Sequence, residues 1–138
     1  MRYPMRWIIL VLATVLGVLT VSACSSSGGS ASTPLGVQDF LKQASAPNVV
    51  VVDVRTPAEF ATGHLQGAIN IDVDGSTFNA QISQLDKNAT YAVYCHSGRR
   101  AGIASDAMTK AGFVHVYRLD GAGIADLQQA GAPLATGA

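Results

Sequence analysis

An α/β fold with a mostly parallel sheet is predicted by the alternation of strand-like and helix-like segments along the chain. Residues 49–54 place five valines around Asp53, a run typical of a strand buried on both faces. Residues 90–94 form a similar strand, and residues 99–110 follow it with the spacing of a helix. Ligands of such folds bind outside the carboxyl ends of the strands, so we expect functional residues just after residues 54 and 94.

Two short helices are expected before the second of these strands. Residues 37–41 carry apolar side chains at the spacing of a first helix. Thr56 is expected to cap a helix that starts at Pro57 and ends near Gly63. Glu59 stands three residues after the cap, which is the spacing of a capping box.

The later elements follow from the same patterns. Ser76 is expected to cap a helix that follows a short strand at residues 68–71. In the helix of residues 99–110, we expect Ile103 to lie on the inner face. The last expected elements are a strand at residues 114–117 and a helix at residues 124–129.

The N-terminus has the organisation of an export signal, because Arg2 and Arg6 precede an uncharged apolar run at residues 7–21. The run ends in Val21-Ser22-Ala23-Cys24, which resembles the lipobox of bacterial lipoproteins. That resemblance implies a diacylated Cys24 as the first residue of the mature chain. A simple cleaved signal peptide with an incidental Cys24, or an uncleaved anchor, remains open.

The resulting organisation has three parts. Residues 1–23 are expected to be a lipoprotein signal peptide, and residues 24–33 a Ser/Gly-rich tether. Residues 34–138 are then one small domain. The expected location is exported and lipid-anchored to the cell membrane, on its extracytoplasmic face.

The composition excludes several classes of partner. The chain has nine Lys and Arg against nine Asp and Glu, and losing Arg2 and Arg6 would leave a net charge of about −2. This balance argues against nucleic acid as a partner and against a polybasic membrane patch. The sequence has no metal-ligand spacing of Cys and His and no Gly-rich phosphate motif, so no cofactor is expected. We expect a monomer.

The candidate nucleophile is Cys95, which follows an apolar strand and opens the segment Cys95-His96-Ser97-Gly98-Arg99-Arg100. Loop amides, a helix N-terminus and two arginines all favour the thiolate form of a cysteine. With Cys24 lipidated, Cys95 would have no partner for a disulfide. The alternative is a buried structural cysteine at a strand end.

Four motifs in order resemble the rhodanese family. Asp53-Val54-Arg55 is similar to its Asp-x-Arg motif, and residues 60–71 resemble its signature, an aromatic residue before Gly-His-aliphatic-x-Gly-Ala. Residues 95–100 look like the rhodanese cysteine loop, and residues 119–133 resemble the closing segment of single-domain members. The closing segment departs from the pattern, with Ala122 between two glycines and Leu127 where the family has Trp. We expect that region to pack differently.

The resemblance implies a doubly wound, mostly parallel five-stranded sheet flanked by helices. It also implies a sulfurtransferase in which Cys95 takes sulfane sulfur from a small donor such as thiosulfate, forming a persulfide. A thiol, or cyanide in an assay, would be the acceptor. The expected substrate-binding residues are Arg55, His96, Ser97, Gly98, Arg99 and Arg100, with Arg99 at the rim.

Other functions remain open. A phosphatase or arsenate reductase of the same fold would need a cysteine loop typically one residue longer than the six residues from Cys95 to Arg100. A non-catalytic rhodanese-like binding module would commonly lack the cysteine. His64, Asp53 and Glu59 are interpreted as structural residues that make hydrogen bonds, ion pairs or caps rather than as acid–base catalysts.

Overall fold

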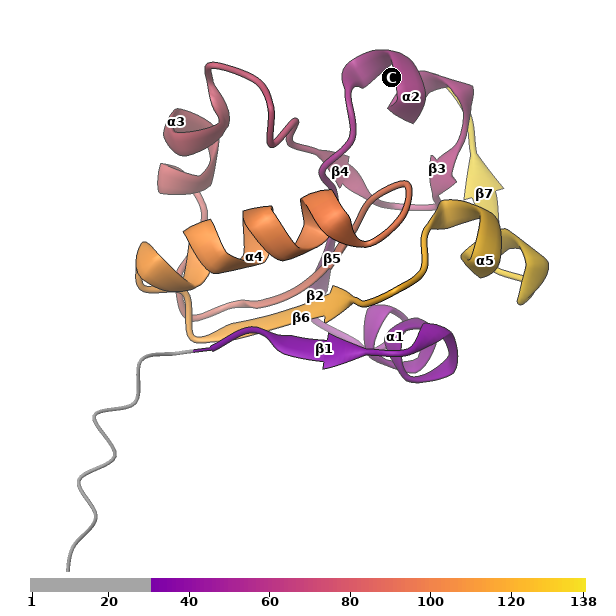
Figure 1. The fold of residues 1–138 in the computed structure, drawn as a ribbon, viewed down its shortest axis with the longest axis horizontal. Coiled ribbons are helices and arrows are strands. Elements are labelled where there is room, and N and C mark those ends of the chain that lie inside the picture. The colour runs from indigo at the N-terminus through magenta and orange to yellow at the C-terminus, as the bar shows by residue number, and fades with distance from the viewer. Residues whose placement is uncertain (1–30) are drawn as a thin grey trace, which may run out of the picture.

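A computed structural model describes residues 31–138 and confirms the α/β fold with a parallel five-stranded sheet (Figure 1). The strand order is β1-β6-β5-β2-β4, and every neighbouring pair is parallel. The strands of this sheet are β1 (Thr33–Leu35), β2 (Val49–Asp53), β4 (Ile69–Asn70), β5 (Thr90–Tyr94) and β6 (His115–Leu119). The helices are α1 (Val37–Ala44), α2 (Pro57–Thr62), α3 (Phe78–Ser83), α4 (Arg99–Lys110) and α5 (Ile124–Gln129).

The predicted signal peptide, Cys24 and most of the predicted tether lie outside the described residues. Within residues 31–138, none of the helices has the length and apolar character needed to span a membrane.

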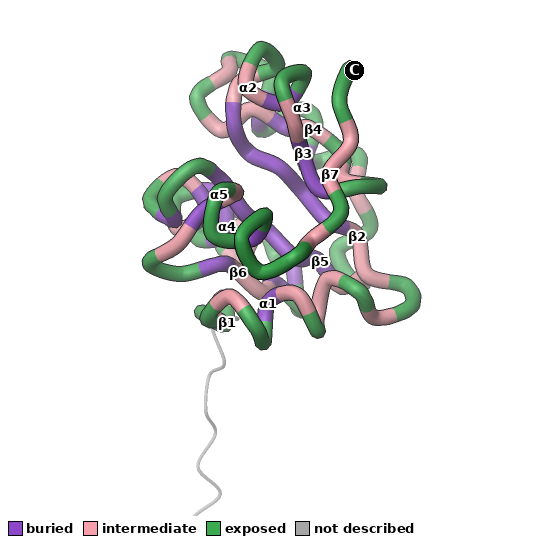
Figure 2. The backbone as a smooth tube through the Cα atoms, turned by 90° about the vertical axis from the view of Figure 1, so that its right-hand side faces the viewer, coloured by how far each residue is buried: buried purple, intermediate pink, exposed green. Residues whose placement is uncertain are grey.

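Helices cover both faces of the sheet, as the doubly wound arrangement requires. Alternate residues of β5 enter two separate cores: Tyr91 and Val93 pack with residues of α3 and α4, while Ala92 and Tyr94 pack with residues of α1 and α5. The central strands are accordingly buried, whereas the outer surfaces of the helices are exposed (Figure 2). Cys95 continues the alternation and joins the core on the α4 side.

Local signals placed most helix ends correctly. Thr56 and Glu59 form the predicted capping box at the start of α2, with the Thr56 hydroxyl accepting from the Glu59 amide. The predicted cap at Ser76 is wrong, because α3 begins at Phe78 and has no side-chain cap. The segment before α3 instead forms backbone turns, in which the Gly75 amide donates to the Asp72 carbonyl.

The predicted inner face of α4 is also wrong in one position. Ile103 is 47% exposed, and the buried residues of this helix are Ala101, Ala104, Ser105 and Met108. Small side chains on this face allow α4 to pack close to the strands.

Three short strands carry no strong local signal. β1 pairs with β6 at the edge of the sheet, where Pro34 is tolerated because an edge strand can leave one row of amides unpaired. β3 (His64–Leu65) and β7 (Leu134–Ala135) form a separate antiparallel pair. Through this pair, residues 134–135 bond to the segment that follows α2.

Candidate active site

Cys95 lies at the carboxyl end of β5, where its side chain is fully buried. Its Sγ accepts a hydrogen bond from the Gly98 amide at 3.1 Å. Its carbonyl accepts from the Ile124 amide at 3.1 Å. Cys95 is a free thiol, and the bond from Gly98 places its sulfur on the inside of the short turn that leads into α4.

Two glycines make this turn possible. Gly98 has φ of +90°, and a Cβ there would stand 2.9 Å from the amide nitrogen of Gly121. A Cβ on Gly123 would stand 1.6 Å from the carbonyl oxygen of His96, so no larger residue fits without moving the backbone. The segment 121–123 thus lies directly against the cysteine loop. Sequence reasoning missed the role of Gly123, which depends on a contact between distant segments.

The two unusual residues of the closing segment, Ala122 and Leu127, pack into the core on the α1 side. Leu127 is fully buried there with Phe40 and Tyr94, and Ala122 packs partly buried against the same cluster. The closing segment contacts the loop through its backbone, and Leu127, where the sequence resemblance implies Trp, fills this core.

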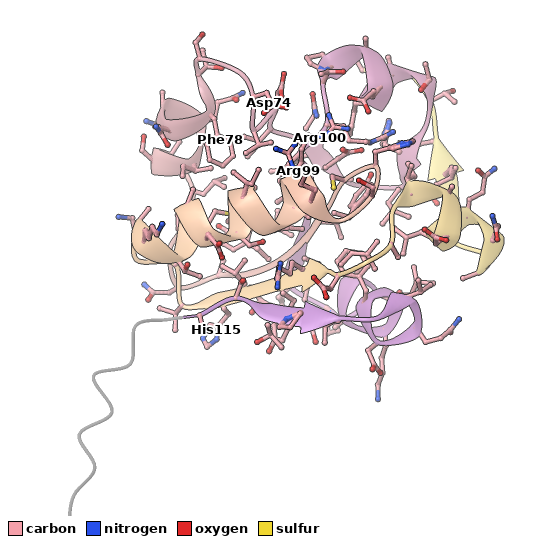
Figure 3. All side chains as sticks on the ribbon, in the orientation of Figure 1. Asp74, Phe78, Arg99, Arg100 and His115 are labelled. Carbon is pink, nitrogen blue, oxygen red and sulfur yellow. The ribbon has the colours of Figure 1, made fainter. Side chains whose placement is uncertain are left out.

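The remaining loop residues are accessible. His96 and Ser97 are exposed, and Arg99, the first residue of α4, is exposed as well. Arg100 is partly buried on the same helical turn. Figure 3 labels both arginines at the start of α4, on the side that faces α2 and α3.

Arg55 reaches the same edge of the sheet as Cys95, because β2 and β5 are neighbours and Asp53 pairs with Tyr94. Its guanidinium is nevertheless held by other groups: Nε and Nη2 donate to the Asp53 carboxylate at 2.6–3.0 Å, and Nη2 also donates to the Gly63 carbonyl at 2.6 Å. Burial lowers the pKa of Arg55, but the bonds and charge of Asp53 outweigh it, so the net shift is upward. Arg55 is thus a charged residue within a buried ion pair.

Further polar groups complete this buried network. The Asn70 side-chain amide donates to the carbonyls of Asp53 and Arg55, at 3.0 and 2.8 Å. The Tyr94 hydroxyl accepts from the Leu65 amide at 2.9 Å, and burial raises the pKa of Tyr94 well above its usual range. These bonds fix the end of β2, and burial keeps the Tyr94 hydroxyl protonated.

Arg100 is paired in a similar way. Its Nη1 and Nη2 donate to the two carboxylate oxygens of Glu59, each at 2.8 Å. Hydrogen bonds to Glu59 raise the pKa of Arg100 against the effect of burial, and the negative charges of Glu59 and Asp74 add to the rise. Glu59 also accepts from the amide and hydroxyl of Thr56. One carboxylate therefore caps α2 and anchors an arginine beside the cysteine loop, a second role that its capping-box position alone does not reveal.

His64 has a structural environment. Its Nδ1 lies 2.9 Å from the Phe60 carbonyl, and its ring stacks on that of Phe60 with centroids 3.6 Å apart. Within residues 31–138, no group of three or more His, Cys, Asp or Glu could hold a metal ion. The groups that the structure gathers at the cysteine loop are a thiol, backbone amides and arginines.

Comparisons with known proteins agree with this arrangement. Residues 36–128 match the model of the rhodanese-like domain. The thiosulfate sulfurtransferase PspE of Escherichia coli (strain K12) is 37% identical over 70 residues, which are 51% of this chain and 67% of the relative. The tRNA uridine(34) hydroxylase of Aster yellows witches'-broom phytoplasma is 33% identical over 63% of this chain and 30% of its own length.

A solved structure supports the same assignment at the level of the fold. The rhodanese-related protein of Thermoplasma volcanium superposes with a TM-score of 0.63 at 25% identity, covering 75% of this chain and 97% of that one. With the domain match over most of residues 31–138 and the cysteine loop in place, the chain belongs to the rhodanese family.

Proposed function

We propose that this protein is a sulfurtransferase that carries sulfane sulfur on Cys95, from a donor such as thiosulfate to a thiol, or to cyanide in an assay. The proposal depends on one observation: the Cys95 thiol is fully buried, and its Sγ accepts a hydrogen bond from a loop amide. A buried sulfur of this kind is suited to a donor that reaches it with one terminal atom.

The chemistry needs one nucleophile and no cofactor. The Cys95 thiolate attacks the outer sulfur of thiosulfate, the S–S bond of the donor breaks, and sulfite leaves with the electron pair. The new persulfide carries negative charge, which the loop amides and the start of α4 can stabilise. An acceptor thiolate or cyanide then attacks the outer sulfur and releases Cys95.

A phosphatase or arsenate reductase is the second candidate, and loop size argues against it. A phosphate places three equatorial oxygens around the nucleophile, each about 2.7–3.1 Å from a donor, which needs a wider ring of amides. In this loop the amide nitrogen of Gly98, three residues after Cys95, already lies 3.1 Å from the Cys95 Sγ. The tight turn favours a single sulfur atom over a tetrahedral oxyanion.

A non-catalytic module is the third candidate. The hydroxylase relative indicates that rhodanese-like sequences occur in proteins named for a different activity. Retention of a buried free thiol at the end of β5, beside two arginines, favours chemistry at Cys95 over binding alone.

The test is mass spectrometry of the intact purified protein after incubation with thiosulfate. We expect a gain of one sulfur atom, about 32 Da, that is removed by cyanide and absent from Cys95→Ser. Hydrolysis of aryl phosphates should be negligible. Efficient phosphatase turnover without a persulfide would support the second candidate, and neither activity would support the third.

We also propose that the protein is exported and anchored through lipid on Cys24, on the sequence pattern Val21-Ser22-Ala23-Cys24. Mass spectrometry of the mature protein should find a diacylglyceryl adduct on an N-terminal Cys24. A mature N-terminus at another residue, or no lipid on Cys24, would leave ordinary secretion or an uncleaved anchor.

A further inference from the structure

The cysteine loop and the entry of the chain into β1 lie toward opposite ends of the sheet. β1 runs parallel to β6, and β6 runs parallel to β5, so the three strands point the same way. Cys95 follows the last residue of β5, at the carboxyl end of the sheet. The chain reaches Thr33 from the amino end, where Figure 3 labels His115, the first residue of β6.

The length of β6 separates the two ends. The four residue steps from His115 to Leu119 cover about 13 Å. Gly98 lies beyond that point, because a Cβ on it would stand 2.9 Å from the amide nitrogen of Gly121. Arg99, which follows Gly98, therefore lies at least this far along the sheet from His115. Figure 3 shows the two labelled side chains well apart, with His115 beside the start of β1.

The proposed anchor is close to the domain in sequence. Nine residue steps join Cys24 to Thr33, and an extended chain covers at most about 3.6 Å in each, so the tether reaches about 32 Å. A compact domain of about 100 residues has a radius of gyration near 13 Å, which corresponds to a sphere about 34 Å across. The tether is thus no longer than the domain is wide.

The entry direction of β1 then favours one orientation on a bilayer. With the amino end of the sheet toward the lipid, the chain from Cys24 runs directly into Thr33. With the cysteine loop toward the lipid, the start of β1 would point away from the bilayer. The tether would then have to run back along the domain near its full extension, at a loss of conformational entropy.

The surface at the amino end also suits contact with lipid headgroups. Val114 is 48% exposed there, and its amide donates to the carbonyl of Lys87 at 3.1 Å. Lys87 and Lys110 are exposed cations near this turn, and Asp86 is an exposed acid beside them in the sequence. The side chains of lysine can reach lipid phosphates while their methylene groups cover apolar surface.

From this geometry we infer that the amino end of the sheet faces the bilayer that holds Cys24, and that the cysteine loop is presented to the water on the opposite side. The inference rests on the lipid anchor proposed above and does not depend on sulfur transfer. Molecules that react at Cys95 then reach it from the aqueous phase, without entering the bilayer.

Energy transfer from the protein to the bilayer measures this orientation. A fluorophore is attached to His115→Cys or to Arg99→Cys, two exposed positions, each in a Cys95→Ser background. Cys24 does not react with the label, because its sulfur is a thioether in the lipid-bearing protein. The mature protein is purified from membranes and placed in vesicles of phosphatidylcholine and phosphatidylglycerol that contain an energy-acceptor lipid.

We expect transfer from residue 115 to be at least about twice that from residue 99, because residue 99 lies at least about 13 Å farther along the sheet. The control variant has about 20 Gly and Ser residues inserted between Gly28 and Gly29, which lengthens the reach of the tether to about 100 Å. The difference between the two positions should shrink in this variant, since the domain is then free to turn.

The outcomes separate this inference from the two proposals above. Equal transfer from both positions, or greater transfer from residue 99, would overturn the orientation and leave the anchor standing. A difference that persists unchanged with the long tether would overturn tether length as its cause. Absence of lipid on Cys24, with no binding to the vesicles, would reject the anchor and this inference with it, while persulfide formation on Cys95 would still be judged by its own test.

Discussion

Gly123 lies so close to His96 that a Cβ on the glycine would stand 1.6 Å from the histidine's carbonyl oxygen. The neighbouring Ile124 amide donates to the Cys95 carbonyl at 3.1 Å. The segment that leads into α5 therefore supports the backbone of the cysteine loop from outside. The shape of the loop is set as much by this distant segment as by its own six residues.

Gly123→Ala is expected to displace the cysteine loop, because the close contact is to backbone and not to a flexible side chain. We predict a loss of about 1–3 kcal/mol in the free energy of unfolding, measured by urea denaturation, together with slower alkylation of Cys95. Gly36→Ala is the control, since a Cβ there meets no atom within 4 Å, and it should cost at most about 1 kcal/mol. Equal behaviour of the two variants would contradict the role assigned to Gly123.

Arg55→Ala should destabilise the protein, because it leaves Asp53 buried without its partner. The expected loss is about 3–5 kcal/mol in the free energy of unfolding. Arg118→Ala serves for comparison: its pair with Asp120 is longer, at 3.4 Å, and more exposed, so its removal should cost less than about 1 kcal/mol. If Arg55→Ala keeps its stability but loses affinity for the sulfur donor, Arg55 binds substrate directly, as the sequence motif implies.

Arg100→Ala should weaken sulfur transfer more than Arg99→Ala. Removing the Arg100 side chain leaves Glu59 unpaired beside the loop, whereas Arg99 is exposed and its charge is screened by water. We expect about 5- to 150-fold slower persulfide formation for Arg100→Ala, equivalent to about 1–3 kcal/mol, and less than about threefold for Arg99→Ala. The reverse order would show that Arg99 is the arginine that acts on the reacting sulfur.

Acid should destabilise the protein in part through Glu59. Hydrogen bonds from Arg100, assisted by those from Thr56, lower the pKa of Glu59 from its usual 4.5 to about 2. Because the folded-state pKa is the lower one, the stabilisation is present above pH 4.5 and is lost as pH falls toward 2. The pair is partly exposed, so we expect about 1 kcal/mol from it.

The measurement is the free energy of unfolding as a function of pH for the parent protein and Glu59→Gln. The variant should be less stable at neutral pH and should show a smaller loss between pH 4.5 and 2, since Gln does not titrate. Parallel curves over that range would mean that the Glu59–Arg100 pair contributes nothing to the stability.

Local patterns in the sequence were sufficient to predict the main elements and the place of Cys95 among them. The strand at residues 90–94 and the helix at residues 99–110 have the predicted bounds, and the final helix at residues 124–129 does too. Each of these depends on side-chain periodicity and glycine placement within one segment. The position of Cys95 between strand and helix follows directly from them.

The short strands and the charge pairs were decided by tertiary structure. β1, β3 and β7 have two or three residues each and exist because distant segments supply their hydrogen bonds. The same holds for Arg100, whose partner Glu59 is 41 residues away. A sequence shows that an arginine is present, but the carboxylates that neutralise it are known only once the chain has folded. For this protein, the sequence by itself determined that a cysteine stands between β5 and α4. The tertiary structure decided which carboxylates pair with the arginines near it, because ion pairs depend on distances that local patterns do not contain.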